Sequence, residues 1–308
     1  MSGSAFLGTS EFAATVLEVL AGTDHRPGLV VTLPDRRRGR GRRELPSPVA
    51  ERADELGIEL MKSGDVNAPA DRERIAAAGG EWASICAFGQ LVRDPLLSQV
   101  PMMNVHPSLL PRWRGAAPIE RAIMAGDRRT GVSIMRLVAG LDSGPVALVE
   151  ETPVDPDEDF GTLSGRLAAI GGRLLGEAHT AAGEGGIGWT EQDDGTATYA
   201  EKIEPDERRI DPALSATSIH DQVRALTPHI GAWIGLENSD RLGVRSVTPL
   251  RDRSLTPGEF EAGGEELVLG CGEGAIRLDV VLPAGGKAME GTAYLQGHGW
   301  PVLAADPE

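Results

Sequence analysis

The end of one apolar run carries two side chains that could take part in acid–base chemistry. Asn104 and His106 stand two positions apart within residues 102–106. Residues two apart in a β-strand project to the same face, so both side chains would lie together where the strand ends. A histidine can move protons near neutral pH, and an asparagine amide can donate to a developing oxyanion. The alternative is a histidine that only hydrogen-bonds the backbone, with an asparagine that stabilises the turn.

A second stretch, residues 140–144, holds one carboxylate between glycines. Asp142 follows the apolar run at residues 131–137. Taken alone, such an aspartate would stabilise a tight turn. Beside Asn104 and His106, it would complete a general acid–base set by orienting the imidazole or a proton-carrying water. The sequence therefore offers these three residues as candidate catalytic groups.

A third stretch, residues 36–43, is strongly basic, with arginines spaced by glycines. A glycine-spaced run of this kind cannot form a core segment, so it predicts a mobile loop after the strand expected at residues 28–33. Arginine side chains present forked donors that suit phosphate groups. The alternative is a solvated basic loop with no fixed partner. Six arginines fall within eight positions: Arg36, Arg37, Arg38, Arg40, Arg42 and Arg43.

The composition limits the classes of protein that these residues can serve. The 308 residues carry 30 Lys and Arg against 46 Asp and Glu, a net charge of −16. This charge argues against broad, non-specific affinity for nucleic acid or anionic membranes. The two cysteines, Cys86 and Cys271, exclude a disulfide framework. Because no run is long enough to span a bilayer and the start lacks a signal peptide, we expect a cytoplasmic protein.

Other common ligand signatures are missing from the sequence. Gly8-Thr9-Ser10 after the first expected strand matches neither the Gly-x-Gly-x-x-Gly nor the Walker fingerprint. The six histidines include no His-x-x-x-His pair, so we expect no metal site. Three of them are expected on helix surfaces: His179, His220 and His229.

Short apolar runs alternate with helical periodicity over the first two-thirds of the chain. This alternation predicts an α/β fold with a largely parallel sheet, whose ligands bind beyond the carboxyl ends of the strands. Ser10 is the expected N-cap of the first helix. The expected strands are residues 4–7, 28–33, 82–88, 102–106, 131–137 and 145–150, and the expected helices are residues 11–20, 48–56, 116–126 and 161–182.

The pattern changes after residue 183. Residues 183–198 are rich in glycine and aspartate and are interpreted as a connector. A helix is expected at residues 218–226, and from residue 231 onward short apolar runs are separated by turn residues. That pattern is typical of a small antiparallel barrel or sandwich. The domain boundary is predicted near residue 200.

The residues from Asn104 to Pro118 carry a family resemblance. This string, Asn-Val-His-Pro-Ser-Leu-Leu-Pro-Arg-Trp-Arg-Gly-Ala-Ala-Pro, resembles the signature of the folate-dependent formyltransferases, in particular those that act on methionyl-tRNA. The resemblance implies a Rossmann-like formyltransferase domain with a mostly parallel sheet at residues 1–200. It also implies a β-barrel-like (OB-like), tRNA-binding domain at residues 201–308. Further similar segments lie at residues 8–13, 34–49, 87–90, 141–144, 209–211 and 283–289.

The resemblance also implies a reaction and a role for each matched residue. The formyl group of N10-formyltetrahydrofolate would pass to the α-amino group of methionyl initiator tRNA, for translation initiation, without a metal or nucleotide and in a monomer. Asn104 would donate to the oxyanion, His106 would stabilise it or move a proton, and Asp142 would orient His106 or an intervening water. The six arginines of residues 36–43 would contact tRNA. Folate would contact Phe88, Gly89, Gln90, Leu91, Ser108, Leu109, Leu110 and Pro111.

Two other functions stay open on the sequence alone. A formyltransferase for a sugar-nucleotide amine or glycinamide ribonucleotide would share the acid–base set but lack the arginine run and the second domain. A tRNA- or folate-binding protein without catalysis would not need that set intact. Residues 201–308 are themselves acidic, with 10 cations against 18 anions. A basic surface there would depend on the arrangement of Arg208, Arg209, Arg241, Arg245 and Lys287.

Overall fold

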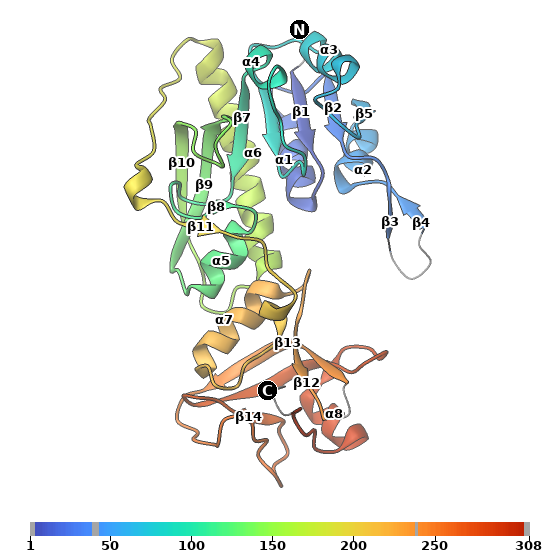
Figure 1. Ribbon diagram of the computed structural model, residues 1–308, viewed down its shortest axis with the longest axis vertical. Coiled ribbons are helices and arrows are strands. Elements are labelled where there is room, and N and C mark those ends of the chain that lie inside the picture. The colour runs from blue at the N-terminus through green and yellow to red at the C-terminus, as the bar shows by residue number, and fades with distance from the viewer. Residues whose placement is uncertain (1–3, 39–42, 238–239, 305–308) are drawn as a thin grey trace. The chain divides into compact units, whose positions relative to one another are not determined.

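The chain divides into two compact units, seen in a computed structural model that describes residues 4–38, 43–237 and 240–304 (Figure 1). Unit 1 comprises residues 1–118, 129–153 and 164–200. Unit 2 comprises residues 119–128, 154–163 and 201–308. Two short segments that precede residue 200 in the sequence therefore belong to unit 2.

The described part of unit 1 is built on a seven-stranded sheet. Five neighbouring strands are parallel, and two at one side are antiparallel. This arrangement confirms the predicted α/β fold with a largely parallel sheet. Across the sheet, the strands are β10 (Val146–Pro153), β9 (Arg129–Arg136), β7 (Met102–His106), β6 (Ala83–Cys86), β1 (Ala5–Gly8), β2 (Leu29–Thr32) and β5 (Glu59–Lys62).

Serine side chains cap the first two helices of unit 1. The Ser10 hydroxyl accepts a hydrogen bond from the Ala13 N–H at the start of the first helix, as the sequence predicts. Ser47 caps the second helix in the same way, with a proline at its first position. The helices are α1 (Glu11–Ala21), α2 (Pro48–Glu55), α3 (Pro69–Ala77), α4 (Leu96–Gln99), α5 (Pro118–Met124) and α6 (Phe160–Gly183), of which the last two have residues in both units.

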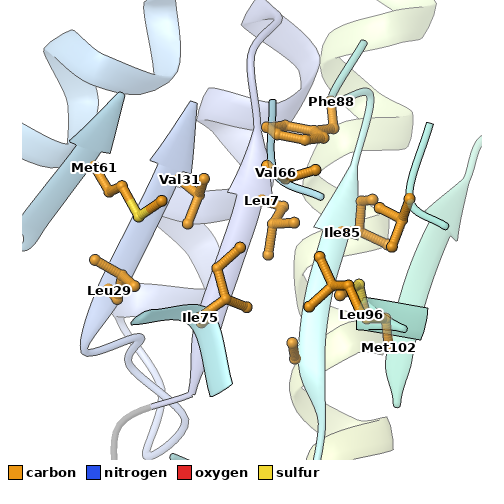
Figure 2. Packing of buried hydrophobic residues seen from close by; sticks show 13 residues of the cluster. Leu7, Leu29, Val31, Met61, Val66, Ile75, Ile85, Phe88, Leu96 and Met102 are labelled. Atoms are coloured by element: carbon orange, nitrogen blue, oxygen red, sulfur yellow. The ribbon is translucent and has the colours of Figure 1, made fainter. Parts of the chain in front are cut away.

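One face of the sheet carries a hydrophobic core (Figure 2). Alternate residues of neighbouring strands point into it, among them Leu7, Val31 and Ile85. Ile75 of α3 and Leu96 of α4 cover these side chains and are almost completely buried. Burial of a side chain of this size stabilises the folded state by about 1.5–3 kcal/mol. This core holds the strands whose carboxyl ends carry the candidate residues.

Two glycines let α6 lie close to the other face of the sheet. A Cβ added to Gly171 would lie 2.6 Å from Cγ1 of Val105 in β7. A Cβ added to Gly172 would lie 2.6 Å from Cβ of Val19 in α1. Both distances are shorter than a van der Waals contact, so a larger residue would displace α6 from the strand that carries His106.

Unit 2 contains an antiparallel sheet that curls into a half-barrel, which confirms the predicted class of the C-terminal domain. Register shifts on both sides of Ser246 bend its longest strand. The sequence prediction missed the last helix, α8. The elements are α7 (Ala216–Leu226), β12 (Ala232–Gly235), β13 (Arg241–Leu250), β14 (Val268–Gly270), β15 (Ala275–Leu282), β16 (Met289–Glu290) and α8 (Gly291–His298).

His179 of α6 is not on the helix surface as expected. Its side chain is buried, and its Nε2 lies 2.8 Å from the Ser84 hydroxyl oxygen of β6. The physical reason is its place four residues after Leu175, on the buried face of α6. His25 stacks on it, with ring centroids 5.5 Å apart. Burial, and then the nearby charge of His25, lower the pKa of His179 to about 4.

We predict that the free energy of unfolding falls as the pH drops from about 6.5 to about 4. In the unfolded chain His179 regains its ordinary pKa and binds a proton over this range, whereas the folded state keeps the ring neutral. Linkage limits the effect of this one residue to about 3 kcal/mol. Denaturant unfolding of the wild type and His179→Gln at several pH values measures it. The variant should show the flatter dependence, and equal slopes for the two proteins would contradict the prediction.

Candidate active site

Strand β7 brings Asn104 and His106 to one face of the sheet of unit 1. In the ladder, Asn104 stands beside Ile85 of β6, and His106 stands beside Ser133 of β9. The His106 side chain is only 5% exposed, whereas Asn104 is half-buried. This face is the one that carries the hydrophobic core, because Met102 of the same strand and parity belongs to that core.

Asp142 approaches His106 from the loop between β9 and β10. Its Oδ2 lies 3.7 Å from His106 Nδ1, an ion-pair distance that is longer than a hydrogen bond. The same Oδ2 accepts a hydrogen bond from the Gly115 N–H at 2.9 Å. On the other side of the imidazole, Nε2 lies 2.8 Å from the Trp113 carbonyl oxygen, which can only accept. An imidazolium would present an N–H to each of these two partners.

The backbone around this pair is strained. Among the described residues, the non-glycine residues with positive φ are Ala87, Trp113 and Asp142, at 41°, 63° and 43°. Residues other than glycine adopt a positive φ at a cost of about 1–3 kcal/mol, and residues in this conformation gather at functional sites. Ala87 follows β6, Trp113 holds His106 through its carbonyl, and Asp142 faces the ring. All three therefore belong to loops at the candidate site.

The string after His106 is held in place by residues 190–200. The Trp113 N–H donates to the Thr198 hydroxyl at 2.9 Å. The short strand β8 (Arg114–Gly115) pairs in parallel with β11 (Tyr199–Ala200). Part of the segment interpreted as a connector is therefore a structural support of the site. Composition alone could not reveal this, because the contacts are formed with residues about 80 positions earlier.

Arg114 and Gln192 extend this support to the Asp142 loop. The Arg114 side chain is buried and donates to Gln192 Oε1 at 3.0 Å and to Asp194 Oδ1 at 2.8 Å. Gln192 Nε2 donates to the carbonyl oxygens of Asp142 at 2.8 Å and Gly144 at 2.7 Å. Sequence reasoning missed Gln192, and no local signal in the sequence points to it.

The residues expected to contact folate have different surroundings. Phe88 is a buried member of the core, and its carbonyl accepts from the Thr9 hydroxyl. The Gln90 amide donates to the Ser63 carbonyl and accepts from the Val66 N–H, so it stabilises the loop. Gly89 has φ 87°, a conformation that favours glycine, and Leu91 is exposed.

The second expected folate segment is also tied down by hydrogen bonds. The Ser108 side chain is fully buried, and its hydroxyl donates to the Arg112 carbonyl at 2.6 Å. The Ser133 hydroxyl donates to the Ser108 carbonyl and accepts from the Leu110 N–H. Leu109, Leu110 and Pro111 are half-buried.

A pocket of about 490 Å³ lies beside the Asp142 loop. Leu137, Val138 and Ala139 line it together with Ser143 and Gly144, which directly follow Asp142. Pockets of roughly 300–1,000 Å³ are typical of small-molecule sites. The sequence signals for this loop were the glycines at positions 140 and 144 and the family resemblance of residues 141–144. The remaining wall comes from Asp94, Leu97, Ser98, Pro101, Arg136, Pro145 and Glu191.

The described part of the arginine run is a hairpin and not the loop that was expected. Strand β3 (Arg36–Arg38) pairs with β4 (Arg43–Leu45), and the two extend beyond the β2–β5 side of the sheet (Figure 1). The Lys62 ammonium lies 2.7 Å from Asp35, which links β5 to the base of the hairpin. Arg36 is exposed. The expected tRNA contacts Arg40 and Arg42 lie outside the described residues.

The arginines expected to form a basic surface in unit 2 have other contacts. Arg208 donates to the carbonyls of Ile230 and Gly231, and Arg245 donates to the carbonyl of Pro228. Both side chains therefore stabilise the turn after α7. The guanidinium of Arg241 lies 4.1 Å from the ring centroid of Trp233 on the neighbouring strand, a cation–π distance.

Residues 4–38, 43–237 and 240–304 contain no group of three His, Cys, Asp or Glu side chains placed to hold a metal ion. No helix in these ranges is long and apolar enough to cross a membrane. Burial raises the pKa of the Cys86 thiol, and it raises that of Cys271 to about 11, so neither thiol is an activated nucleophile.

Comparison with known proteins relates this geometry to a family. The family model described as formyl transferase matches residues 4–178, and the one described as formyl transferase, C-terminal domain, matches residues 202–299. A methionyl-tRNA formyltransferase of Parvibaculum lavamentivorans is 38% identical over 298 residues, covering 95% of this chain and 96% of its own. One of Rhizobium meliloti is 39% identical over 305 residues, covering 97% and 96%.

The solved structures support the fold. An N-formyltransferase from Helicobacter canadensis, in complex with folinic acid and dTDP-3-aminofucose, superposes with a TM-score of 0.66. It is 15% identical, and the match covers 90% of this chain and 99% of that one. At this identity the likeness concerns the fold alone. With a family model matching more than half of its residues and relatives similar over nearly its whole length, this chain belongs to the formyl transferase family.

Proposed function

We propose that this chain transfers the formyl group of N10-formyltetrahydrofolate to the α-amino group of methionyl initiator tRNA. The observation that carries the proposal is the end-to-end similarity to proteins named methionyl-tRNA formyltransferase, at 38–39% identity. That similarity spans both units, including the arginine hairpin and the C-terminal half-barrel. The product would serve translation initiation.

The acid–base set of unit 1 suits this reaction. When the amine nitrogen attacks the formyl carbon, negative charge develops on the formyl oxygen, and the half-buried Asn104 amide is suited to donate to it. His106 is proposed to take the proton lost by the nitrogen and return it to N10 as the old bond breaks. Asp142 faces the imidazole at 3.7 Å and would stabilise its charged form during this transfer.

The pocket beside Asp142 is suited to the folate. Its volume of about 490 Å³ fits a fused ring system, and its wall includes the residues that directly follow Asp142. The expected contacts at residues 88–91 and 108–111 remain part of the proposal, and they lie outside the lining of this pocket. Phe88, Gln90 and Ser108 would contribute backbone groups, since their side chains are used within the fold. Folate supplies the formyl group, and the chain orients it towards His106.

We further propose that residues 1–200 form the catalytic domain and that residues 201–308 form a tRNA-binding domain. The six arginines of residues 36–43 offer forked donors to a phosphate backbone. Asn104, His106 and Asp142 all come from one chain, so a monomer would suffice. A cytoplasmic location belongs to the same proposal, because the proposed product serves translation initiation. Sugar-nucleotide amines and glycinamide ribonucleotide are disfavoured as acceptors, because the relatives matched over both units are named for methionyl-tRNA.

The proposed activity is tested by incubating the purified chain with N10-formyltetrahydrofolate and methionyl initiator tRNA. We expect formyl-methionyl-tRNA, detected by mass spectrometry after the ester is hydrolysed. Methionyl elongator tRNA and a dTDP-aminosugar serve as the alternative acceptors. Formylation of the sugar amine without formylation of the tRNA would overturn the proposal in favour of the second acceptor class.

Replacing His106 by alanine should lower kcat about 10²–10⁴-fold, the usual effect of removing a general acid–base. The affinity for tRNA should stay within about twofold of the wild type. The ring is buried and hydrogen-bonds the Trp113 carbonyl, so it offers no surface contact to the tRNA. Single-turnover formylation and a filter-binding titration measure the two quantities. His25→Ala, which removes a histidine from the same unit, should keep full activity. A large loss of tRNA affinity in His106→Ala would argue against a catalytic role.

Replacing Arg40 and Arg42 together by alanine should weaken tRNA binding and flatten its salt dependence. Two lost phosphate contacts reduce the slope of log K against log salt by about 2. The matched control is the double alanine variant of Arg72 and Arg74 on α3, which changes the net charge equally. If both double variants keep the wild-type slope, the run is a solvated basic segment and not a tRNA contact.

A further inference from the structure

Asp142 requires support from outside its own loop. Its backbone lies at φ 43°, the left-handed region that costs an L-residue about 1–2 kcal/mol. Its carboxylate faces His106 only while that conformation persists. Residues 140 and 144 are both glycine, which leaves the loop many other conformations in the absence of external contacts.

Gln192 provides such contacts. Its Nε2 donates to the carbonyl of Asp142 at 2.8 Å and to that of Gly144 at 2.7 Å. Both N–H groups of this amide therefore bind the backbone of one loop. One binds at Asp142, which faces His106, and the other binds two residues later. The partners determine the orientation of the amide, because the two carbonyls can only accept and Arg114 Nε can only donate.

The oxygen of the same amide connects the loop to the other partner of His106. Gln192 Oε1 accepts from Arg114 Nε at 3.0 Å. Arg114 lies between Trp113, whose carbonyl contacts His106 Nε2, and Gly115, whose N–H donates to the Asp142 carboxylate. One side chain therefore bridges the two segments that contact the imidazole on its two nitrogens.

Gln192 is itself well anchored. The backbones of Thr190 and Val146 exchange two hydrogen bonds of 2.8 and 2.9 Å, which ties its segment to the start of β10. Asp194, two residues later, binds the buried Arg114 side chain at 2.8 Å. The amide can therefore transmit a fixed position to the Asp142 loop.

We propose that Gln192 is a positioning residue that holds the Asp142 loop and the segment of Arg114 in the arrangement in which His106 meets its two partners. The role rests on the proposed formyl transfer. Gln192 touches none of the reacting atoms and acts through Asp142. Its contribution is to the geometry of the acid–base pair, where a misplacement of about 1 Å can cost about 10²-fold in rate.

The test is Gln192→Glu, which keeps the size of the side chain and removes its donors. A carboxylate still accepts from Arg114 but cannot donate to the carbonyls of Asp142 and Gly144. We expect kcat for formyl transfer to fall about 10–100-fold, while KM for methionyl-tRNA stays within about twofold. Gln192→Met, of similar length and without charge, should show the same split and separates lost donors from added charge.

Gln222 of α7 provides a matched control. Its Nε2 also donates to two backbone carbonyls, those of Glu207 at 2.8 Å and Arg209 at 3.0 Å, but in unit 2. Gln222→Glu removes two hydrogen bonds of the same kind. It should lower Tm about as much as Gln192→Glu does, with kcat unchanged. An equal fall of kcat in the variants of Gln192 and Gln222 would overturn the positioning role, because general loss of stability would then explain both.

A second readout does not depend on activity. The Gly115 N–H donates to the Asp142 carboxylate, so its amide resonance and its hydrogen exchange report on the position of that carboxylate. We expect an upfield shift and faster exchange in Gln192→Glu and Gln192→Met, but not in Gln222→Glu. An unchanged Gly115 resonance would overturn the inference. If the wild type formylates no methionyl-tRNA, the proposed function fails, and the Gly115 signal still decides whether Gln192 positions the loop.

Discussion

The approach of the Asp142 carboxylate to the His106 imidazole is the constraint that the surrounding parts of unit 1 satisfy. His106 lies on a buried strand, whereas Asp142 lies on a loop that has to fold back to within 3.7 Å of the ring. In this arrangement Asp142 adopts a left-handed backbone, with φ 43°. A Cβ on Gly144 would lie 1.9 Å from the Arg136 carbonyl oxygen, so the return of the loop to the sheet requires glycine at that position.

Strain at this site is balanced by the rigidity of its surroundings. Trp113 and Ala87 share the unfavourable left-handed conformation, and such residues persist only where the fold overdetermines them. α6 packs closely against Val105 on one face of β7, and the core that contains Ile75 and Leu96 covers the other face of the sheet. Thr198, Gln192 and Asp194 bind the segment of Trp113 and Arg114, which follows β7. The contacts of Trp113 and Arg114 with residues 190–200 join positions about 80 residues apart in the sequence.

Charge is distributed in a way that suits selective contact with RNA under the proposed function. A net charge of −16 disfavours indiscriminate attraction to phosphate backbones. Six arginines concentrated within residues 36–43 oppose this background locally. In unit 2, Arg208 and Arg245 bind the carbonyls of the turn after α7, and Arg241 stacks on Trp233. Part of the positive charge of this acidic unit is therefore used in contacts that stabilise its fold.

By itself, the sequence determined the features that depend on residues close together in the chain, such as helix caps and the periodicity of strands and helices. Alternating periodicity predicted the parallel sheet and the following antiparallel domain, Ser10 predicted the start of α1, and Asn-x-His predicted two side chains on one face of β7. Only the tertiary structure decided which distant residues meet. It placed Gln192 against residues 142 and 144, and it buried His179 against Ser84. Periodicity and composition describe each segment against solvent or a core, whereas these contacts depend on where segments tens of residues apart are brought together.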